Sequence, residues 1–257
     1  MNLLRTMWRT FFSTIFRSVL TVRLCRVLLF FGFIGYAGLA MAADEPLDPD
    51  PWSTMNRVTY RFNDRLDTWI LRPVARGYDR VMPKPLQRGL SNVFDNFGEP
   101  SVVINQVLQG KLKEGASDFA RFLINSTIGI GGLFDVAYRM GLLEHDEDFG
   151  QTLAVWGVPQ GPYFIIPLRG SASVTHAGGM IVDAFTNPMR FIRPIRARSV
   201  TYGLYYVDLR TRLLGMDALI SGDEYLFIRD AYLQQRDYLI KDGEIEDDPF
   251  LDDDFDD

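Results

Sequence analysis

The sequence predicts a mainly α-helical protein that folds as a single domain and contains one small β-hairpin. Apolar residues recur every three or four positions along most of the chain between residues 50 and 240, which is the period of an amphipathic helix. Prolines and glycines divide this stretch into short segments of helical length. One region, residues 149–170, loses the helical period. About 200 residues without an internal repeat or a long linker are typical of one domain.

The N-terminal segment predicts export from the cytoplasm. Residues 1–26 contain five arginines and no acidic residue, and residues 27–40 are an apolar run. This run is shorter than the roughly 20 residues of a membrane-spanning helix. Ala40-Met41-Ala42 then supplies the small residues of a cleavage site, so we expect residues 1–42 to be a cleaved signal peptide. The helical domain is assigned to residues 43–241.

Proline positions define the first expected helices. Asp50-Pro51 marks a helix start, because proline is favoured at the first helical position. An apolar stripe follows it as far as Pro73. Later prolines are expected to end one short helix and begin the next, up to Gly110. These prolines are Pro73, Pro83, Pro85 and Pro100.

The second half of the chain changes period twice. Residues 116–124 form an apolar stripe that leads into a glycine-rich segment, and residues 133–140 continue the pattern. Residues 152–156 and 163–166 are two short apolar runs around a Gly/Pro turn, which predicts a hairpin. Helical periodicity then returns in three segments, residues 173–185, 199–214 and 223–240, with a breaker at Asn187-Pro188.

The glycine-rich segment has the most unusual composition in the chain. Gly129, Gly131 and Gly132 lie within four residues, and each glycine in a helix costs roughly 1 kcal/mol relative to alanine. Their concentration predicts an unusual backbone conformation or the close approach of another group to the backbone. A lipid chain or a neighbouring helix would suit the apolar residues among the glycines, which are Ile128, Ile130 and Leu133.

Residues arranged for catalysis or metal binding are scarce, so we predict a protein that is not an enzyme and needs no metal or other cofactor. His145 and His176 lack the spacing of metal ligands, and the one cysteine, Cys25, precedes the predicted cleavage site. No G-x-S-x-G turn of a lipase is present. Ser173, His176 and Asp183 supply the residue types of a catalytic triad, which only geometry can identify.

The charge distribution disfavours nucleic-acid binding. The chain has 27 basic and 33 acidic residues, and no domain is strongly basic. Residues 242–257 contain ten of the acidic residues and are interpreted as a disordered, solubilising tail. A docking strip for a basic periplasmic partner is the alternative. The acidic cluster at residues 144–148 lacks the ligand spacing of a calcium loop and is interpreted as a solvated loop.

Three arginines near residue 195 are candidate contacts for a phospholipid headgroup. Arg193, Arg196 and Arg198 alternate with apolar side chains. A guanidinium pairs bidentately with phosphate, and its aliphatic stem can lie along an apolar surface. A solvated basic turn is the alternative. The apolar neighbours are Phe191, Ile192 and Ile195.

Many short motifs follow one another in order from about residue 50 to about residue 238. They are Met55-Asn-Arg57, Phe62-Asn63, Leu71-Arg-Pro-Val-Ala75, Gly89-Leu-Ser-Asn92, Glu99-Pro100, Asn105 with Leu108-Gln-Gly110, Asp148-Phe-Gly-Gln-Thr-Leu153, Trp156-Gly157, Gly161-Pro-Tyr163, Pro167-Leu168 and Asp230-Ala-Tyr232, together with the glycine segment. By their number and order, the chain resembles the MlaA/VacJ family, whose members move phospholipid out of the bacterial outer membrane.

The resemblance implies a fold and a function. It implies a ring of short amphipathic helices that lies in the inner leaflet of the outer membrane around an amphipathic channel. Mislocalised phospholipid from the outer leaflet would pass through this channel to a soluble periplasmic carrier protein, which maintains lipid asymmetry. An outer-membrane porin trimer is a further expected partner. The resemblance also assigns Ile128–Leu133 to a conformationally sensitive segment next to the channel, and it marks Asn56, Arg57, Phe62 and Asn63 as family residues of the first helix.

Attachment to the membrane is where the sequence departs from this family. Members commonly carry a lipoprotein signal, whereas Cys25 lies before the apolar run and cannot serve as a lipobox cysteine. We therefore expect the folded domain to hold the protein at the periplasmic face of the outer membrane. An alternative function is a porin-associated envelope scaffold without a lipid conduit. A periplasmic lipid hydrolase is a third, but it lacks a recognisable nucleophile or metal site.

Overall fold

Long helices account for most of the fold in the computed structural model, which describes residues 49–220 and 222–243. The described residues belong to one compact unit that begins at residue 48. The predicted signal peptide lies outside the described residues, as does the acidic tail beyond Gly243. The predicted boundaries of the helical domain, residues 43–241, stay a prediction.

The first predicted helix is present but extends beyond its expected end. Helix α2 (Ser53–Leu66) passes through a π-helical turn, η1 (Asp67–Leu71), directly into α3 (Arg72–Val81). Pro73 was expected to end a helix, and this was wrong. The π-helical turn interrupts the regular hydrogen-bond ladder just before Pro73, which therefore stands within the first two positions of α3, where its missing N–H costs little.

Helix α4 (Lys84–Gln109) corrects a second expectation about proline. It runs for 26 residues and contains Pro100 in its interior, although Pro100 was expected to separate two short helices. An interior proline costs about 3 kcal/mol or more. Glu99 and Ser101, on either side of Pro100, hold the helix to Arg121 at 3.0 Å and to Asp183 at 2.9 Å, which belong to other helices. The helix ends as predicted at Gly110, whose φ of 84° is the left-handed conformation typical of a helix C-terminus.

The middle of the chain contains three helices and the hairpin. Helix α5 (Leu112–Thr127) leads into the glycine-rich turn, and the short α6 (Val136–Arg139) follows it. Residues 152–156 were expected to form a strand, but Phe149–Val155 is helix α7, which begins with the Asp148 side chain accepting a hydrogen bond from Gln151 N at 2.9 Å.

The hairpin therefore has a different second strand from the one predicted. Strand β1 (Tyr163–Ile166) is one of the two expected strands, and it pairs antiparallel with β2 (Gly170–Ser173). The register places Tyr163 opposite Ser173 and Ile166 opposite Gly170.

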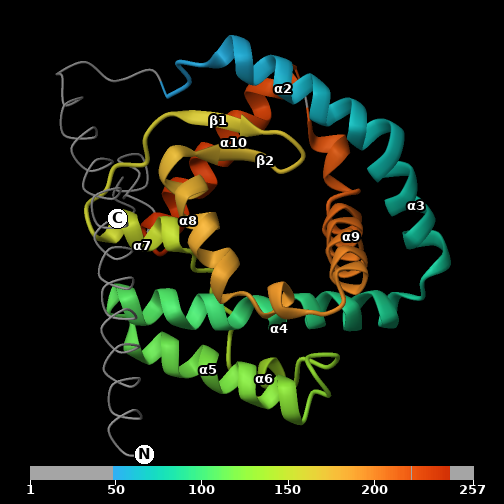
Figure 1. Ribbon diagram of the computed structural model, residues 1–257, viewed down its shortest axis with the longest axis vertical. Coiled ribbons are helices and arrows are strands. Elements are labelled where there is room, and N and C mark those ends of the chain that lie inside the picture. Colours follow the sequence, from blue (N-terminus) through green and yellow to red (C-terminus); the bar gives the residue numbers. More distant parts are fainter. Residues whose placement is uncertain (1–48, 221, 244–257) are drawn as a thin grey trace, which may run out of the picture. The chain divides into compact units, whose positions relative to one another are not determined.

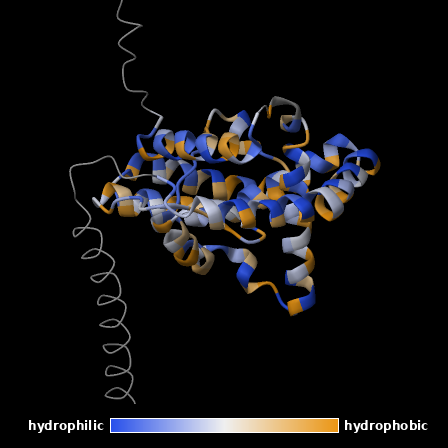
Figure 2. Ribbon diagram, turned by 90° about the horizontal axis from the view of Figure 1, so that it is seen from above, coloured by the Kyte–Doolittle hydropathy of each residue, from blue (hydrophilic) through white to orange (hydrophobic). Residues whose placement is uncertain are grey.

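The remaining helices close the structure. They are α8 (Val174–Thr186), a 3-10 turn η2 (Pro188–Phe191), α9 (Ile195–Arg212), a second 3-10 turn η3 (Met216–Leu219) and α10 (Glu224–Ile240). In Figure 1, α2, α3, α4, α8 and α9 surround an open centre, while α5 and α6 lie on the far side of α4. Apolar and polar residues alternate along most helices in Figure 2, as expected for amphipathic helices.

The distribution of apolar side chains is unusual for a compact helical unit. The small buried core is built around Tyr163, Ile165 and Tyr225. Many large apolar side chains are exposed instead, among them Trp69 (74%) and Val81 (82%). Of the helices in the described ranges, none combines the length and the apolar character needed to cross a membrane.

Candidate functional site

The glycine-rich turn adopts the unusual backbone that its composition predicts. Ile130, Gly131 and Gly132 have φ values of 56°, 70° and 90°, so three consecutive residues occupy the left-handed region. That region is unfavourable for a β-branched residue such as Ile130. A side chain at Gly129 would place its Cβ 2.3 Å from the carbonyl oxygen of Phe134, and one at Gly132 would lie 2.6 Å from Asn96 Cβ. Positive φ and close packing therefore both require glycine here.

Helix α4 separates the glycine-rich turn from the open centre. Leu133 packs so close to α4 that a Cβ on Gly89 would lie 2.8 Å from Leu133 Cδ1. Ile128 and Ile130 are 66% and 68% exposed, and they leave the turn with an apolar outer surface. The turn lies on the side of α4 away from the opening in Figure 1, so it does not line the opening.

A buried polar network holds the two ends of this turn together. Arg121 on α5 pairs with Glu99 of α4 at 3.0 Å and reaches Asp135, at the start of α6, at 3.4 Å. Asn125 accepts hydrogen bonds from the backbone N–H groups of Val136 and Ala137 at 2.9 and 3.0 Å. Burial raises the pKa of Glu99 to about 7, against the lowering effect of the Arg121 guanidinium.

Sequence reasoning did not single out this network. The available signal was a charged residue at each end of an otherwise apolar segment, Arg121 and Asp135. Asn125 lies one turn after Arg121 on α5, whereas Glu99 comes from α4, and its motif Glu99-Pro100 did not indicate which residue it would contact.

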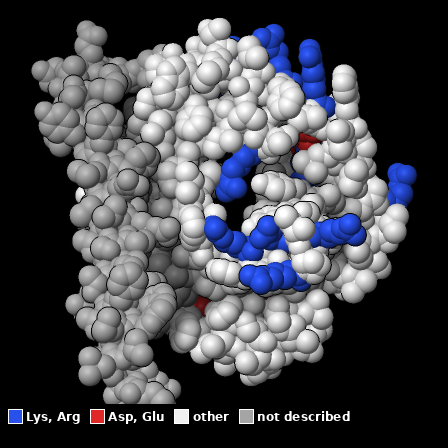
Figure 3. Space-filling model, in the orientation of Figure 1, with Lys and Arg blue, Asp and Glu red and all other residues white. Residues whose placement is uncertain are grey.

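The predicted arginine cluster lies at the edge of the opening. Arg193 and Arg196 are exposed, and Arg198 donates a hydrogen bond from Nη1 to the carbonyl oxygen of Arg190 at 3.0 Å. In the described part of the chain, none of these four arginines forms an ion pair. Figure 3 shows Lys and Arg side chains gathered beside a central opening, over the region of η2 and the start of α9. The exposed side chains of Phe191 and Ile195 place apolar surface next to these charges.

The family residues of the first helix hold the hairpin in place. The Asn56 side chain is fully buried, accepts a hydrogen bond from Ile165 N at 3.0 Å and donates to the carbonyl of Tyr163 at 3.2 Å. Asn63 makes the same pair of contacts further along, with Ile166 O at 3.0 Å and Leu168 N at 2.8 Å. Asn56 therefore satisfies the outer edge of β1, and Asn63 holds the end of β1 and the turn that follows it.

The other two first-helix residues face outward. Arg57 pairs with Asp223 at 2.8 Å and lies 4.5 Å from the centre of the Tyr225 ring, which ties α2 to the start of α10. Phe62 is 50% exposed.

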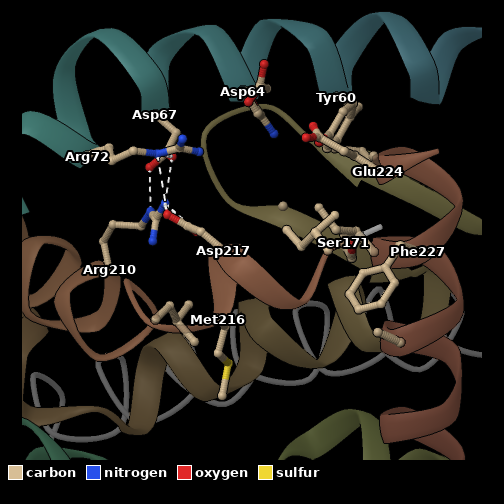
Figure 4. Close-up of a pocket in the computed structure, with 17 residues that line it drawn as sticks. Tyr60, Asp64, Asp67, Arg72, Ser171, Arg210, Met216, Asp217, Glu224 and Phe227 are labelled. Atoms are coloured by element: carbon tan, nitrogen blue, oxygen red, sulfur yellow. Dashed lines mark hydrogen bonds and ion pairs between the residues drawn. The ribbon is translucent and has the colours of Figure 1, made fainter. Parts of the chain in front are cut away.

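An amphipathic pocket of about 610 Å³ lies between the first helix, the hairpin, the end of α9 and α10. Figure 4 shows the ion cluster on one side of it and apolar side chains on another. Asp67 accepts hydrogen bonds from Arg210 at 2.7 Å and from Arg72 at 3.0 Å, and Arg210 also pairs with Asp217 at 2.9 Å. The apolar lining includes Ile165, Leu213, Met216, Ile220, Phe227 and Ile228.

The charges in this cluster compensate one another. Partial burial alone would raise the pKa of Asp67, but the hydrogen bonds and charges of Arg210 and Arg72 outweigh it and lower that pKa. A pocket with a fixed polar side and an apolar wall suits an amphiphilic molecule.

The residue types of a triad are not brought together. The Ser173 hydroxyl caps α8 and contacts Gln160 at 3.0 Å, while His176 Nδ1 lies 2.9 Å from the Tyr232 hydroxyl. Asp183 accepts hydrogen bonds from Ser101 and other groups instead. The described residues contain no group of three potential metal ligands.

Comparisons with known proteins agree on one family. A sequence model described as "MlaA lipoprotein" matches residues 48–239. The chain is 37% identical over 203 residues to the intermembrane phospholipid transport system lipoprotein MlaA of Escherichia coli (strain K12), an alignment that covers 76% of this chain and 80% of that protein. The protein of the same name from Haemophilus influenzae is 32% identical over 202 residues, covering 76% of this chain and 81% of that protein.

The fold is also similar to a solved structure. A chain from the work "Structural basis for maintenance of bacterial outer membrane lipid asymmetry" superposes with a TM-score of 0.67 at 33% sequence identity. The superposition covers 74% of this chain and 98% of that chain.

Proposed function

Because this chain belongs to the MlaA lipoprotein family, we propose that it transports phospholipid between membranes and thereby maintains the lipid asymmetry of a bacterial outer membrane. In this proposal, phospholipid that has reached the outer leaflet passes through the opening in the helical ring. A soluble periplasmic carrier then receives it. The protein stands beside a porin trimer at the periplasmic face of the outer membrane.

The observation that carries the proposal is the combination of charged and apolar side chains at the edge of the opening. A phospholipid has apolar tails and a charged head, and moving the head through an apolar space without a polar partner costs several kcal/mol. Arg193, Arg196 and Arg198 offer guanidinium groups that are free of ion pairs in the described part of the chain. Phe191 and Ile195 offer apolar contact next to them.

Exposed apolar side chains support a position of the ring in the inner leaflet. Trp69, Val81 and Leu168 are each more than 70% exposed. Covering a large apolar side chain contributes about 1.5–3 kcal/mol, and lipid tails would supply that cover. The folded domain itself would then provide membrane attachment.

In this proposal, the glycine-rich turn of Ile128–Leu133 is the conformationally sensitive segment. Its left-handed residues and its tight packing against α4 fix one conformation, and a change there would move the helix that borders the opening. The turn would thus modulate the conduit without lining it.

The test measures surface-exposed phospholipid in a deletion strain of the source organism. Restoring the wild-type gene should lower the exposed phospholipid that accumulates on deletion. The variant Arg193→Gln with Arg196→Gln should restore less, whereas a control that removes two exposed arginines away from η2 and α9, Arg65→Gln with Arg139→Gln, should restore fully. A folded, correctly located rim variant that restores asymmetry completely would contradict the role of these arginines.

Deletion itself distinguishes the conduit from the scaffold. No change in exposed phospholipid on deletion, with the protein expressed, would reject transport. A variant Gly131→Trp separates the two functions further. A Cβ at Gly131 meets no atom within 4 Å, whereas its φ of 70° strains any side chain, so we expect the turn to be perturbed and porin association to be retained. Altered lipid asymmetry with retained porin association supports the conduit.

A further inference from the structure

A second pocket, separate from the opening and from the amphipathic pocket, has a strongly acidic lining. It has a volume of about 520 Å³ and lies where three parts of the chain meet. These are the junction of α4 and α5, the loop of residues 144–147, and the end of α10. We call it the acidic pocket, and its lining residues are Gln106, Lys111, Glu114, Glu144, His145, Asp146, Glu147, Tyr238, Leu239, Asp242 and Gly243.

The negative charge of this pocket is not balanced from within. Five carboxylates line it, and Lys111 is the only lysine or arginine among the lining residues. Lys111 is already committed to Glu147, at 2.6 Å, and to Asp242. Glu114 and Asp146 have no ion pair within the described ranges. Loss of hydration in the pocket and the nearby charges of Asp148 and Glu147 raise the pKa of Asp146, as expected where like charges crowd together.

A buried acceptor in the lining also lacks a donor. Gln106 is fully buried, and its side-chain amide donates to Asp118 at 2.5 Å. Its carbonyl oxygen, Oε1, receives no hydrogen bond from the described residues. An unsatisfied buried polar group costs about 1–3 kcal/mol, so an occupant that donates hydrogen bonds would be stabilised here. The negative charge of the lining and the unsatisfied Gln106 Oε1 both favour an occupant that is positively charged and donates hydrogen bonds.

Three observations favour a basic side chain carried by a polypeptide over other cations. The described residues contain no cluster of three potential metal ligands. A zwitterionic lipid headgroup would bring a phosphate with its amine, and Lys111, the cation available to receive that phosphate, is already held in two ion pairs. Tyr238 and Leu239 add an aromatic and an aliphatic wall against which the stem of a lysine or arginine can lie.

The sequence that follows the pocket residues is also acidic. Residues 244–257 contain nine acidic residues and come directly after Gly243, a lining residue, in the sequence. A concentrated single-sign charge accelerates the approach of an oppositely charged partner.

We infer that the acidic pocket is a docking site for a lysine- or arginine-bearing segment of a protein partner. The basic side chain enters between the 144–147 loop and the end of α10. Its charge is shared by Glu114 and Asp146, next to Glu144, which also lies 3.7 Å from Arg121. Its N–H groups supply the donor that Gln106 lacks. This inference does not depend on the proposed transport function.

The test uses the mature chain, residues 43–257, in detergent and a fluorescently labelled peptide of alternating lysine and glycine. Binding is followed by fluorescence anisotropy, with a second peptide in which glutamine replaces every lysine. The variant Glu114→Gln with Asp146→Asn removes two carboxylates that form no ion pair, so the fold should be retained. We expect it to weaken binding of the lysine peptide by about tenfold or more.

The matched control removes the same charge from α10 outside the pocket, with Asp230→Asn and Asp237→Asn. It should change binding by less than about twofold, because neither carboxylate lines the pocket and both already face a cation, Arg229 and Lys241. Equal weakening in both double variants would assign binding to net charge alone and overturn the inference. Equal binding of the glutamine peptide would also overturn it.

Two competitors test the other occupants. Displacement of the peptide by calcium would identify a metal-ion site, and displacement by phosphoethanolamine would identify a headgroup site. Either result would overturn the polypeptide assignment, whereas binding that resists both competitors supports it.

Discussion

Replacing single glycines in the turn after α5 with alanine tests whether backbone conformation and packing against α4 act separately. Gly131 and Gly132 are adjacent and both have positive φ, 70° and 90°. They differ in their surroundings, because a Cβ at Gly131 meets no atom within 4 Å, whereas one at Gly132 lies 2.6 Å from Asn96 Cβ. Both substitutions therefore place a side chain at positive φ, and only Gly132→Ala also brings a Cβ into close contact with Asn96.

The expected magnitudes follow from these two terms. An L-residue held in the left-handed region costs about 1 kcal/mol relative to glycine, so Gly131→Ala should lower the free energy of unfolding by about that amount. Gly132→Ala adds an overpacked contact with Asn96, for which about 1–3 kcal/mol is typical. We expect its total loss to be about 2–4 kcal/mol.

A third glycine provides a control for which the free energy of unfolding should change in the opposite direction. Gly77 lies inside α3 with open space around it and without positive φ, so Gly77→Ala should raise the free energy of unfolding by about 0.5–1 kcal/mol. All three variants are compared with the wild type by urea unfolding in the same detergent, followed by circular dichroism. Equal losses at Gly131 and Gly132 would refute the reasoning, because they would show that packing against α4 does not constrain the turn.

Three further predictions concern polar contacts. Asn63→Ala removes two hydrogen bonds, one to the end of β1 and one to the turn after it, and should cost about 2 kcal/mol, with faster amide hydrogen exchange at Leu168 as the local readout. Asp67→Asn weakens the half-buried cluster with Arg210 and should lower the free energy of unfolding by about 2 kcal/mol, measured by urea unfolding. Glu99 has a folded-state pKa of about 7, raised from 4.5, so the folded state retains a proton that the unfolded state releases, and this group makes stability fall as pH rises from about 4.5 to about 7. Glu99→Gln should remove a fall on the order of 3 kcal/mol over that range, measured as the difference between the pH profiles of variant and wild type.

Each of these predictions has a contrasting variant or result. Asn92→Ala loses only one long contact, to Leu133 O at 3.4 Å, and should change stability much less than Asn63→Ala. Asp79→Asn removes an exposed ion pair with Lys84 and should be nearly neutral beside Asp67→Asn. Identical pH profiles for Glu99→Gln and the wild type would show that Glu99 does not titrate in this range.

Local pattern alone was sufficient for most helices of this protein. The three- and four-residue period predicted α8, α9 and α10 close to their observed positions, and the glycine and proline signals placed the ends at Gly110 and Asn187-Pro188. Resemblance to the MlaA/VacJ family, confirmed by the comparisons, rested on many short motifs in order. The helical period, the glycine and proline signals and the order of the motifs can be identified without knowing which residues pack against them.

Tertiary contacts decided the helices and the strand that local sequence pattern did not predict. Pro100 stays inside α4 because neighbouring helices hold it, and residues 152–155 become helix because Asp148 caps that segment. The second strand, Gly170–Ser173, consists of small residues without a β signal and exists because β1 pairs with it.

The site shows the same division. Sequence composition predicted an unusual backbone at residues 129–132, and the structure shows why three of these positions are glycine, through positive φ at Gly131 and Gly132 and close packing at Gly129 and Gly132. Its position behind α4, its closure by Arg121 and Glu99, and the clamping of the hairpin by Asn56 and Asn63 required the fold. Such contacts join residues from different parts of the chain, and a buried polar group gives no sign in sequence of which distant partner satisfies it.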